Sequence, residues 1–156
     1  MTKIDRGRMV RTDRQICIQM ELLANSLMAE AELTAVQAHI LQYVYRHCEQ
    51  GTSLTEIHRD FGGSMAALSG MVKRLREKGY VRVECCVRDD RCKLLFPTEK
   101  GRQIQPFLEE TTRKVQEQIY GCLSQQELAT LDQLQKKLLK NLSQLTQPKS
   151  KEASKP

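Results

Sequence analysis

Tryptophan is absent from this chain of 156 residues, and aromatic side chains make up only 4% of it. The core must therefore consist mainly of Leu, Ile, Val and Met side chains, which suit packing between helices. No apolar run approaches the roughly 18 residues of a membrane span, and the initial sequence MTKIDRGRMVRTDR lacks the apolar segment of a secretory signal. We therefore expect a cytoplasmic protein with no membrane partner.

Signatures of metal binding and catalysis are also missing. The six cysteines include no CxxC pair, and without an export signal we interpret them as reduced thiols rather than as three disulfides. The spacing of His39, His47 and His58 fits no standard zinc site. No Ser-His-Asp arrangement, phosphate-binding glycine loop or carboxylate pair is recognisable. The sequence thus predicts a protein that is not an enzyme and that has no metal site and no cofactor.

Helical periodicity dominates the first third of the chain. Residues 1–13 are polar and basic, which predicts a flexible arm, and Asp13 is a candidate N-cap for a helix over 14–33. The apolar stripe of this helix consists of Ile16, Met20, Leu23 and Leu27. A second helix follows the candidate cap Thr34 and ends before Gly51.

Two shorter helices come next. Residues 52–54 form a β-compatible link, and Thr55 opens a third helix that ends at the Gly62-Gly63 pair. Ser64 is the candidate cap of a fourth helix, which Gly79 ends. The apolar residues of the fourth helix are Leu68, Met71, Val72 and Leu75. Two helices joined by a glycine turn are typical of a helix-turn-helix.

The period then changes from that of a helix to that of a strand. Apolar and polar residues alternate over 80–87 and 92–96, which predicts two strands with a polar tip at 88–91. Between Lys73 and Lys93 there are eight basic residues and four acidic ones, a net charge of +4. This concentration of positive charge favours a polyanionic partner. A helix-turn-helix followed by a hairpin with a basic tip predicts a winged helix.

The remaining sequence is helical again. Thr98 is the candidate cap of a long helix that Pro106 should kink, and Ser124 with Glu127 forms an S-x-x-E capping box before a last helix. The last helix carries a leucine stripe, which a monomer could bury in its core and a dimer could bury between subunits. We expect residues 146–156 to be a disordered tail. Residues 14–145 form one predicted domain, mainly α with a small β-hairpin.

Two stretches of this pattern resemble the MarR (multiple antibiotic resistance regulator) family of winged-helix transcription factors. The first is LREKGYV, residues 75–81, and the second is RDDRCKLLFPTEKG, residues 88–101. The second resembles the wing signature of the family, Asp-x-Arg followed after a strand by Leu-Thr-x-x-Gly. Pro97 departs from it where Leu is usual, and Gly70 departs where the family commonly has a longer polar side chain.

The resemblance implies a homodimer that binds an inverted-repeat operator in double-stranded DNA. The winged helix would span about 34–98, and the dimerisation helices about 14–33 and 98–145. The expected dimerisation residues are Leu131, Leu134, Leu138, Leu142 and Leu145. The resemblance also implies a repressor that a small molecule or oxidation releases from DNA.

The fourth helix would enter the major groove with its polar side. Ser64 and Ser69 can hydrogen-bond to bases, Ala66 can touch a thymine methyl, and Gly70 allows close backbone approach. Ala67 has the same methyl group, but we interpret it, like Glu77, as part of the exposed side of an amphipathic helix. Phosphate contacts are expected from Lys73, Arg74 and Arg76. Because no Arg, Asn or Gln stands in the first half of this helix, we expect modest direct readout of bases.

On the wing, Arg91 is the expected minor-groove residue, because a narrow groove concentrates negative potential. Asp89 would hold its guanidinium by a charge-assisted hydrogen bond, and Arg88 and Lys93 would contact phosphates. The competing interpretation is a surface ion pair between Asp89 and Arg91.

Two control sites compete. One is an apolar cleft at the junction of the first, second and fifth helices, lined by Leu23, Leu27, His39 and Ile104, which would bind a small-molecule effector. The other is Cys17, placed near a helix start, where a thiol pKa falls and oxidation could act as the switch. We favour control by a noncovalent ligand over control by oxidation of Cys17. A winged-helix protein-interaction module without DNA binding is the remaining alternative, although it would not require the positive charge around the wing.

Overall fold

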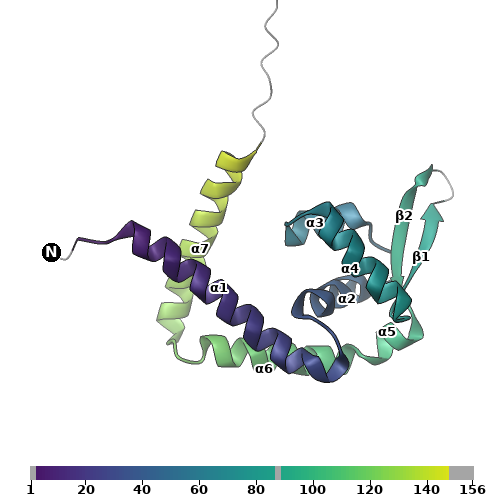
Figure 1. Cartoon of the computed structure of the whole chain (residues 1–156), viewed down its shortest axis with the longest axis horizontal. Coiled ribbons are helices and arrows are strands. Elements are labelled where there is room, and N and C mark those ends of the chain that lie inside the picture. The colour runs from purple at the N-terminus through teal and green to yellow at the C-terminus, as the bar shows by residue number, and fades with distance from the viewer. Residues whose placement is uncertain (1–2, 87–88, 148–156) are drawn as a thin grey trace, which may run out of the picture. The chain divides into compact units, whose positions relative to one another are not determined.

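The structure is a computed structural model that describes residues 3–86 and 89–147, with only the backbone described for residues 86 and 89–92. In chain order its elements are α1 (Arg6–Met28), a short 3-10 helix η1 (Ala29–Ala31), α2 (Ala35–Arg46), α3 (Leu54–Phe61), α4 (Met65–Glu77), β1 (Val81–Cys86), β2 (Asp89–Pro97), α5 (Glu99–Gln103), α6 (Gln105–Tyr120) and α7 (Gln125–Thr146) (Figure 1). The chain divides into two compact units, residues 1–116 and residues 117–156. The mainly α fold with one antiparallel hairpin is the predicted one.

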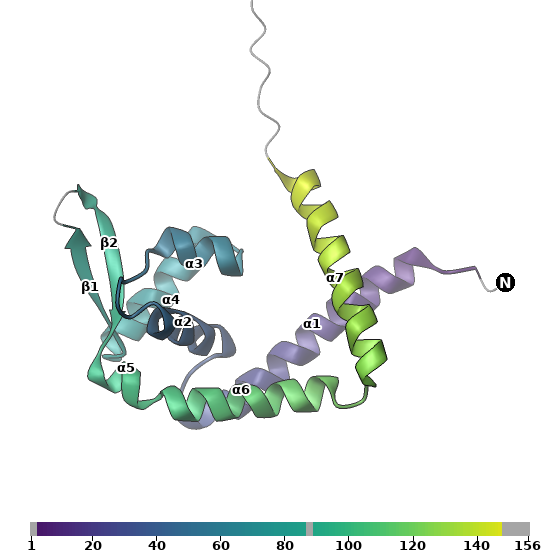
Figure 2. The ribbon, with the colours of Figure 1, turned by 180° about the vertical axis from the view of Figure 1, so that it is seen from behind.

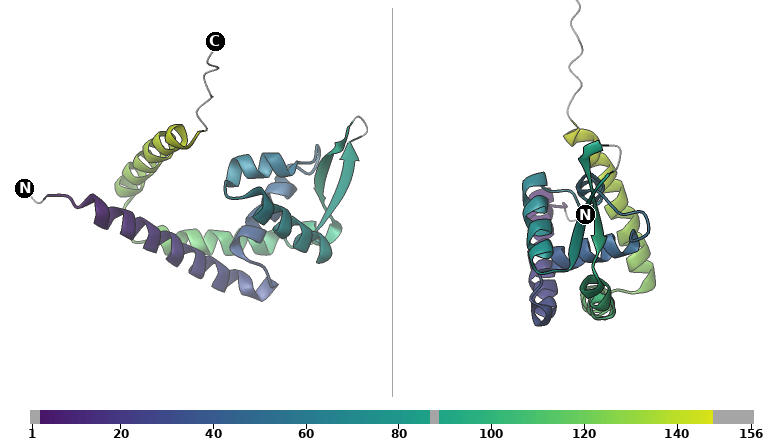
Figure 3. Two further views of the ribbon diagram at one scale, coloured as in Figure 1. Left: turned by 45° about the horizontal axis from the view of Figure 1, so that its top comes forward. Right: turned by 90° about the vertical axis from the view of Figure 1, so that its right-hand side faces the viewer.

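The first helix begins earlier than the sequence analysis predicted. The Asp5 carboxylate accepts a hydrogen bond from the Arg8 N–H at 3.1 Å and caps α1, so residues 6–13 are helical and the prediction of a flexible arm is wrong for them. Asp13, the predicted cap, lies inside the helix because Met9 and Val10 continue its apolar periodicity toward the N-terminus. Figure 3 shows the N-terminal half of α1 extending beyond α2.

The core of the first unit forms around α2, which lies between the α3–α4 pair and α6 (Figures 1 and 2). Thr34 caps α2 as predicted, and Gln37 completes a capping box with it. The fully or almost fully buried core side chains include Ile40, Leu41, Val44, Ile57, Leu68, Leu75, Leu95 and Leu108. These aliphatic side chains come from α2, from the α3–α4 pair, from β2 and from α6. A core of this kind was expected from the shortage of aromatic residues.

The link between α2 and α3 adds a bridge to the hairpin. The Thr52 N–H donates to the Leu95 carbonyl at 3.2 Å, and the Leu95 N–H donates back to the Thr52 carbonyl at 2.7 Å. The next residue, Ser53, caps α3 with Glu56 in a capping box, so α3 starts at Leu54, one residue before the predicted start at Thr55. The bridge ties the base of the wing to the start of the helix-turn-helix.

The wing is a two-stranded antiparallel hairpin. Its register runs from Val81 opposite Pro97 to Cys85 opposite Lys93, and an irregularity follows between Cys85 and Cys86. The predicted alternation is confirmed in the first part of β1, where Val81 is buried and Arg82 and Glu84 are exposed. It does not hold at Cys85, which is exposed, or in β2, where Leu95 is buried and Leu94 and Phe96 are only partly buried. The predicted tip at 88–91 was too long, because β2 already begins at Asp89.

The predicted long helix after the wing is interrupted rather than kinked. Thr98 caps α5 as predicted, but α5 ends at Gln103, and α6 begins at Gln105. Pro106 has no N–H to donate to the carbonyl four residues earlier, so the helical hydrogen bonding is broken at this point. The break allows a short helix at the base of the wing and a longer one under α2.

The described part of the second unit consists of the last residues of α6 and the whole of α7. Ser124 and Glu127 form the predicted capping box: the Glu127 N–H donates to the Ser124 hydroxyl, and the Ser124 N–H donates to the Glu127 carboxylate at 2.8 Å. The stripe leucines Leu134, Leu138, Leu142 and Leu145 are 53% to 72% exposed in the single chain. In the part of the chain that the structure describes, no helix has the length and apolar character to cross a membrane.

Candidate nucleic-acid interface

The turn between α3 and α4 sets how the candidate recognition helix α4 is presented. Gly62 and Gly63 have φ values of 71° and 78°, which only glycine adopts without strain. The His58 Nε2 lies 2.9 Å from the Gly63 carbonyl, to which it donates, and the Ser64 hydroxyl accepts from the Ala67 N–H at 3.0 Å. These contacts fix the end of α3 and the start of α4 relative to each other.

The two sides of α4 differ as the sequence predicted. Leu68 and Leu75 are buried, and α4 packs through this side on α2, α3 and β1. The predicted DNA-contacting residues Ser64, Ala66, Ser69, Gly70, Lys73, Arg74 and Arg76 are all exposed. A Cβ built on Gly70 would meet no heavy atom within 4 Å. The structure therefore brings these residues together on one open surface, with small side chains near the N-terminus and cations near the C-terminus.

The wing adds further positive charge next to α4. Lys93, predicted to contact phosphate, is exposed on β2 opposite Cys85. Arg82 was not singled out from the sequence; its guanidinium pairs with Glu84 and lies 4.7 Å from the centre of the Phe96 ring, its partner in the strand register. The strand alternation that exposes Arg82 could have indicated it.

The predicted wing-tip residues are covered only in part. Arg88 lies outside the described residues. Asp89 and Arg91 belong to β2, but their side chains are not described, so their predicted pairing and minor-groove role stay predictions.

The end of the wing signature makes internal contacts. The Thr98 hydroxyl donates to the Gly79 carbonyl at 2.5 Å, and the Thr98 N–H donates to the Tyr80 carbonyl at 3.1 Å. A Cβ on Gly101 would overlap this same Tyr80 carbonyl oxygen, so only glycine fits. Lys100 also spans this junction, donating to the Lys78 carbonyl at 2.7 Å while its ammonium lies 4.5 Å from the centre of the Tyr80 ring. The contacts hold the end of α4 against the start of α5.

This arrangement of helices and hairpin can be compared with known proteins. Residues 33–93 match the model of the MarR family. This part of the chain resembles a MarR-family domain. The match covers α2 to the middle of β2, which includes the helix-turn-helix and most of the wing.

Solved MarR-family structures share the fold over most of the chain. A Cys-to-Ser mutant of MarR from E. coli, solved with operator DNA, is 23% identical with a TM-score of 0.76, covering 87% of this chain and 99% of that chain. MepR from S. aureus, solved as a DNA complex, is 19% identical with a TM-score of 0.79, covering 89% and 99%. The transcriptional regulator SlyA is 21% identical with a TM-score of 0.79, covering 87% and 94%.

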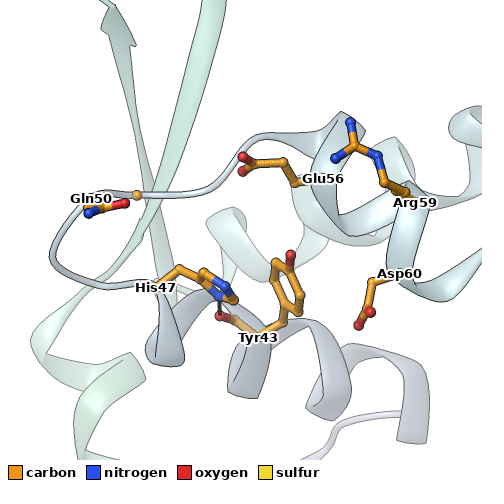
Figure 4. A pocket seen from close by; sticks show the side chains of 7 residues that line it. Tyr43, His47, Gln50, Glu56, Arg59 and Asp60 are labelled. Atoms are coloured by element: carbon orange, nitrogen blue, oxygen red, sulfur yellow. Dashed lines mark hydrogen bonds between the residues drawn. The ribbon is translucent and has the colours of Figure 1, made fainter.

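Two hollows lie beside α2 and α3. One, of about 250 Å³, is lined by Tyr43, His47, Gln50, Gly51, Glu56, Arg59 and Asp60 (Figure 4). The other, of about 210 Å³, is lined by His39, Tyr43, Arg46, Asp60 and Phe61. Of the predicted effector-site residues Leu23, Leu27, His39 and Ile104, His39 alone borders either hollow, so the apolar cleft stays a prediction.

Rings and cations surround these hollows. Tyr43 stacks on His47 with ring centres 4.3 Å apart, and His39 stacks on Phe61 at 6.0 Å. Partial burial and the nearby Arg46 guanidinium lower the pKa of His39 below its ordinary value. In Figure 4 the Arg59 and Glu56 side chains come from the α3 side of the hollow. The lining is more polar than the predicted apolar cleft.

The physical argument for Cys17 as a redox switch does not hold in this structure. Because α1 begins at Arg6, Cys17 lies eleven residues into the helix. The positive end of a helix dipole acts only within the first turn, so it does not reach Cys17. Cys17 is exposed and unpaired. Among the residues that the structure describes, no three His, Cys, Asp or Glu side chains are grouped so as to hold a metal.

Proposed function

We propose that this protein is a sequence-specific DNA-binding transcriptional regulator. The observation that carries the proposal is the exposed side of α4, which combines small residues at its N-terminal half with cations at its C-terminal half in a MarR-family domain. Two similar structures are complexes with DNA, which supports placing α4 in a major groove.

The cations of α4 and those of the wing have different roles in the proposed DNA binding. Lys73, Arg74 and Arg76 contact phosphates along the edges of the major groove. Lys93 and Arg88 contact phosphates beside the wing, and Arg91, held by Asp89, enters the minor groove. Arg82 is a further phosphate contact, because its pairing with Glu84 is exposed to solvent and exchanges readily for a phosphate.

The protein acts as a homodimer on an inverted repeat. Each unit, taken by itself, exposes apolar side chains that a single chain leaves in water: Met9, Val10, Ile16, Ile18 and Leu22 on α1, and Leu134, Leu138, Leu139, Leu142 and Leu145 on α7. A second copy of the chain would bury both sets. A two-fold dimer presents two α4 helices, which matches half-sites of opposite orientation.

The regulator is a repressor that a noncovalent ligand releases from its operator. A ligand acts through its different affinity for the DNA-fitting and non-fitting states, and a coupling of about 3 kcal/mol produces a hundredfold release. The predicted cleft at Leu23, Leu27, His39 and Ile104 is the proposed effector site. Oxidation of Cys17 is the weaker candidate, because the thiol lies outside the first turn of α1.

Selection from a random duplex library tests the proposed function. We expect recovery of an inverted repeat, and we expect its affinity to fall steeply with salt, because several phosphate contacts release counterions. Fluorescence anisotropy at two salt concentrations measures this slope. Recovery of no palindromic sequence at moderate salt would contradict DNA binding and favour the protein-interaction module.

A further inference from the structure

The part of α4 that enters the major groove first carries very little hydrogen-bonding capacity. Between Met65 and Val72, Ser69 is the only residue with a polar side chain. All the cations of α4 lie at or after Lys73, more than two helical turns from its start. This half of α4 therefore meets the bases with methyl, methylene and backbone atoms.

The bases differ in what they offer such a surface. Guanine is read by Arg or Lys, adenine by Asn or Gln, and cytosine by Asp or Glu, and residues 65–72 include none of these. Thymine alone presents an apolar group in the major groove, its 5-methyl. The apolar first half of α4 can therefore make a favourable contact with the thymine methyl group, which is the only apolar group that the bases present in the major groove.

The exposed alanines of α4 are not equivalent. Ala66, Gly70 and Lys73 follow one another at spacings of four and three residues, so they form one stripe, and all three are exposed. Ala67 shares its stripe with Met71, which is partly buried against the core. The stripe of Ala66 is therefore the one directed away from the domain, and the open space at Gly70 allows it to approach a base closely.

We propose that α4 recognises thymine methyl groups, with Ala66 as the residue that determines specificity and Gly70 as the position that permits close approach. The half-site would carry thymine at the position under Ala66. Met65, 41% exposed at the first position of α4, extends the apolar surface on one flank. This inference rests on the proposed DNA binding and specifies the class of sequence bound.

Uracil provides the test, because it differs from thymine only by the missing 5-methyl group. The duplex recovered from the random library is synthesised with each half-site thymine replaced in turn by uracil, in both half-sites. We expect one position at which affinity falls about fourfold per half-site, the effect of removing one buried CH₂-sized contact. Fluorescence anisotropy at fixed salt measures the ratio of the two affinities.

Two protein variants test whether Ala66 is the residue that contacts the thymine methyl group. In Ala66→Gly the thymine-to-uracil ratio at that position should fall to about one, because the methyl of the partner is gone. Ala67→Gly is the matched control: it makes the same change one residue later in α4, with a similar loss of helix propensity, and should keep the wild-type ratio.

Three outcomes would overturn the inference. A recovered half-site without thymine, or one in which uracil binds as tightly as thymine at every position, would exclude methyl readout while leaving DNA binding intact. An Ala66→Gly variant with the wild-type ratio would exclude Ala66 as the reader. Failure to recover any duplex would instead reject the proposed function, and this inference with it.

Discussion

Thr98 and Gly101 stand at the end of the sequence stretch that resembles the MarR wing, and their contacts are made inside the domain. Thr98 hydrogen bonds to the carbonyls of Gly79 and Tyr80, and Gly101 leaves room for the second of these. The two residues therefore position α4 and the wing relative to α5. A signature associated with DNA binding thus includes residues that act by holding the DNA-binding elements in place.

Replacing Gly101 by alanine should destabilise the protein by about 2 to 3 kcal/mol, because the added methyl would overlap the Tyr80 carbonyl and force α5 away from the end of α4. Urea unfolding followed by circular dichroism measures the free energy of unfolding. Gly70→Ala is the matched control: its Cβ has open space, so stability should stay unchanged or rise by up to about 1 kcal/mol. Equal losses in the two variants would contradict the role given to Gly101.

At the scale of the element, the predictable helices were those with both a cap residue and an apolar stripe. Thr34, Ser64 and Ser124 were identified as caps from the sequence, and each caps its helix in the structure. The exposed residues of α4 followed from the same periodicity. The start of α1 was missed because two aspartates, Asp5 and Asp13, are equally good caps, and the apolar residues between them, Met9 and Val10, are exposed.

The interruption between α5 and α6 was harder to foresee. Pro106 indicates the loss of a hydrogen bond, but whether a helix bends or stops depends on tertiary contacts. Here the Gln105 side chain donates to the Gly101 carbonyl at 2.7 Å and satisfies it at the break. Likewise, strand alternation can predict that Arg82 is exposed, but only the register shows that it lies opposite Phe96. Such long-range pairings are not contained in local periodicity.

The capping box of α3 should make stability depend on acid pH. The Glu56 carboxylate accepts hydrogen bonds from the Ser53 N–H at 2.9 Å and from the Thr52 hydroxyl at 2.8 Å, and these lower its pKa below the ordinary value of 4.5. Because the folded pKa is lowered, this stabilisation is complete above pH 4.5 and is lost as pH falls through the folded pKa.

Glu56→Gln keeps an acceptor oxygen but cannot titrate, so its free energy of unfolding should vary less between pH 6 and pH 3 than that of the wild type. Urea unfolding across this range measures the difference. Glu49→Gln, an exposed change for which the structure gives no cap contact, is the comparison and should keep the wild-type slope. A wild-type slope in Glu56→Gln would show that the cap carries no acid sensitivity.

At the scale of the whole molecule, the exposed apolar side chains are the feature that a single chain leaves unexplained. Most of them lie on α1 in the first unit and on α7 in the second, outside the aliphatic core around α2. Two copies of α4 that bind one duplex must be held at a fixed separation, which an isolated winged helix does not provide. Assembly and operator binding should therefore depend on the same residues.

Placing glutamate at Leu138 and Leu142 should dissociate the proposed dimer and abolish operator binding together, because two charges would be buried without partners in the subunit interface. Light scattering should report twice the chain mass of 17.9 kDa for the wild type and the single mass for the variant. Gln133→Glu with Ser143→Glu is the matched control: it adds the same two charges to the opposite side of α7, where both residues are exposed, and should leave mass and binding unchanged.

A wild-type monomer, or a Leu138→Glu and Leu142→Glu protein that keeps its dimer mass, would reject the leucine stripe as the interface. A monomeric variant that still binds the inverted repeat at wild-type affinity would separate assembly from recognition and show that one winged helix suffices.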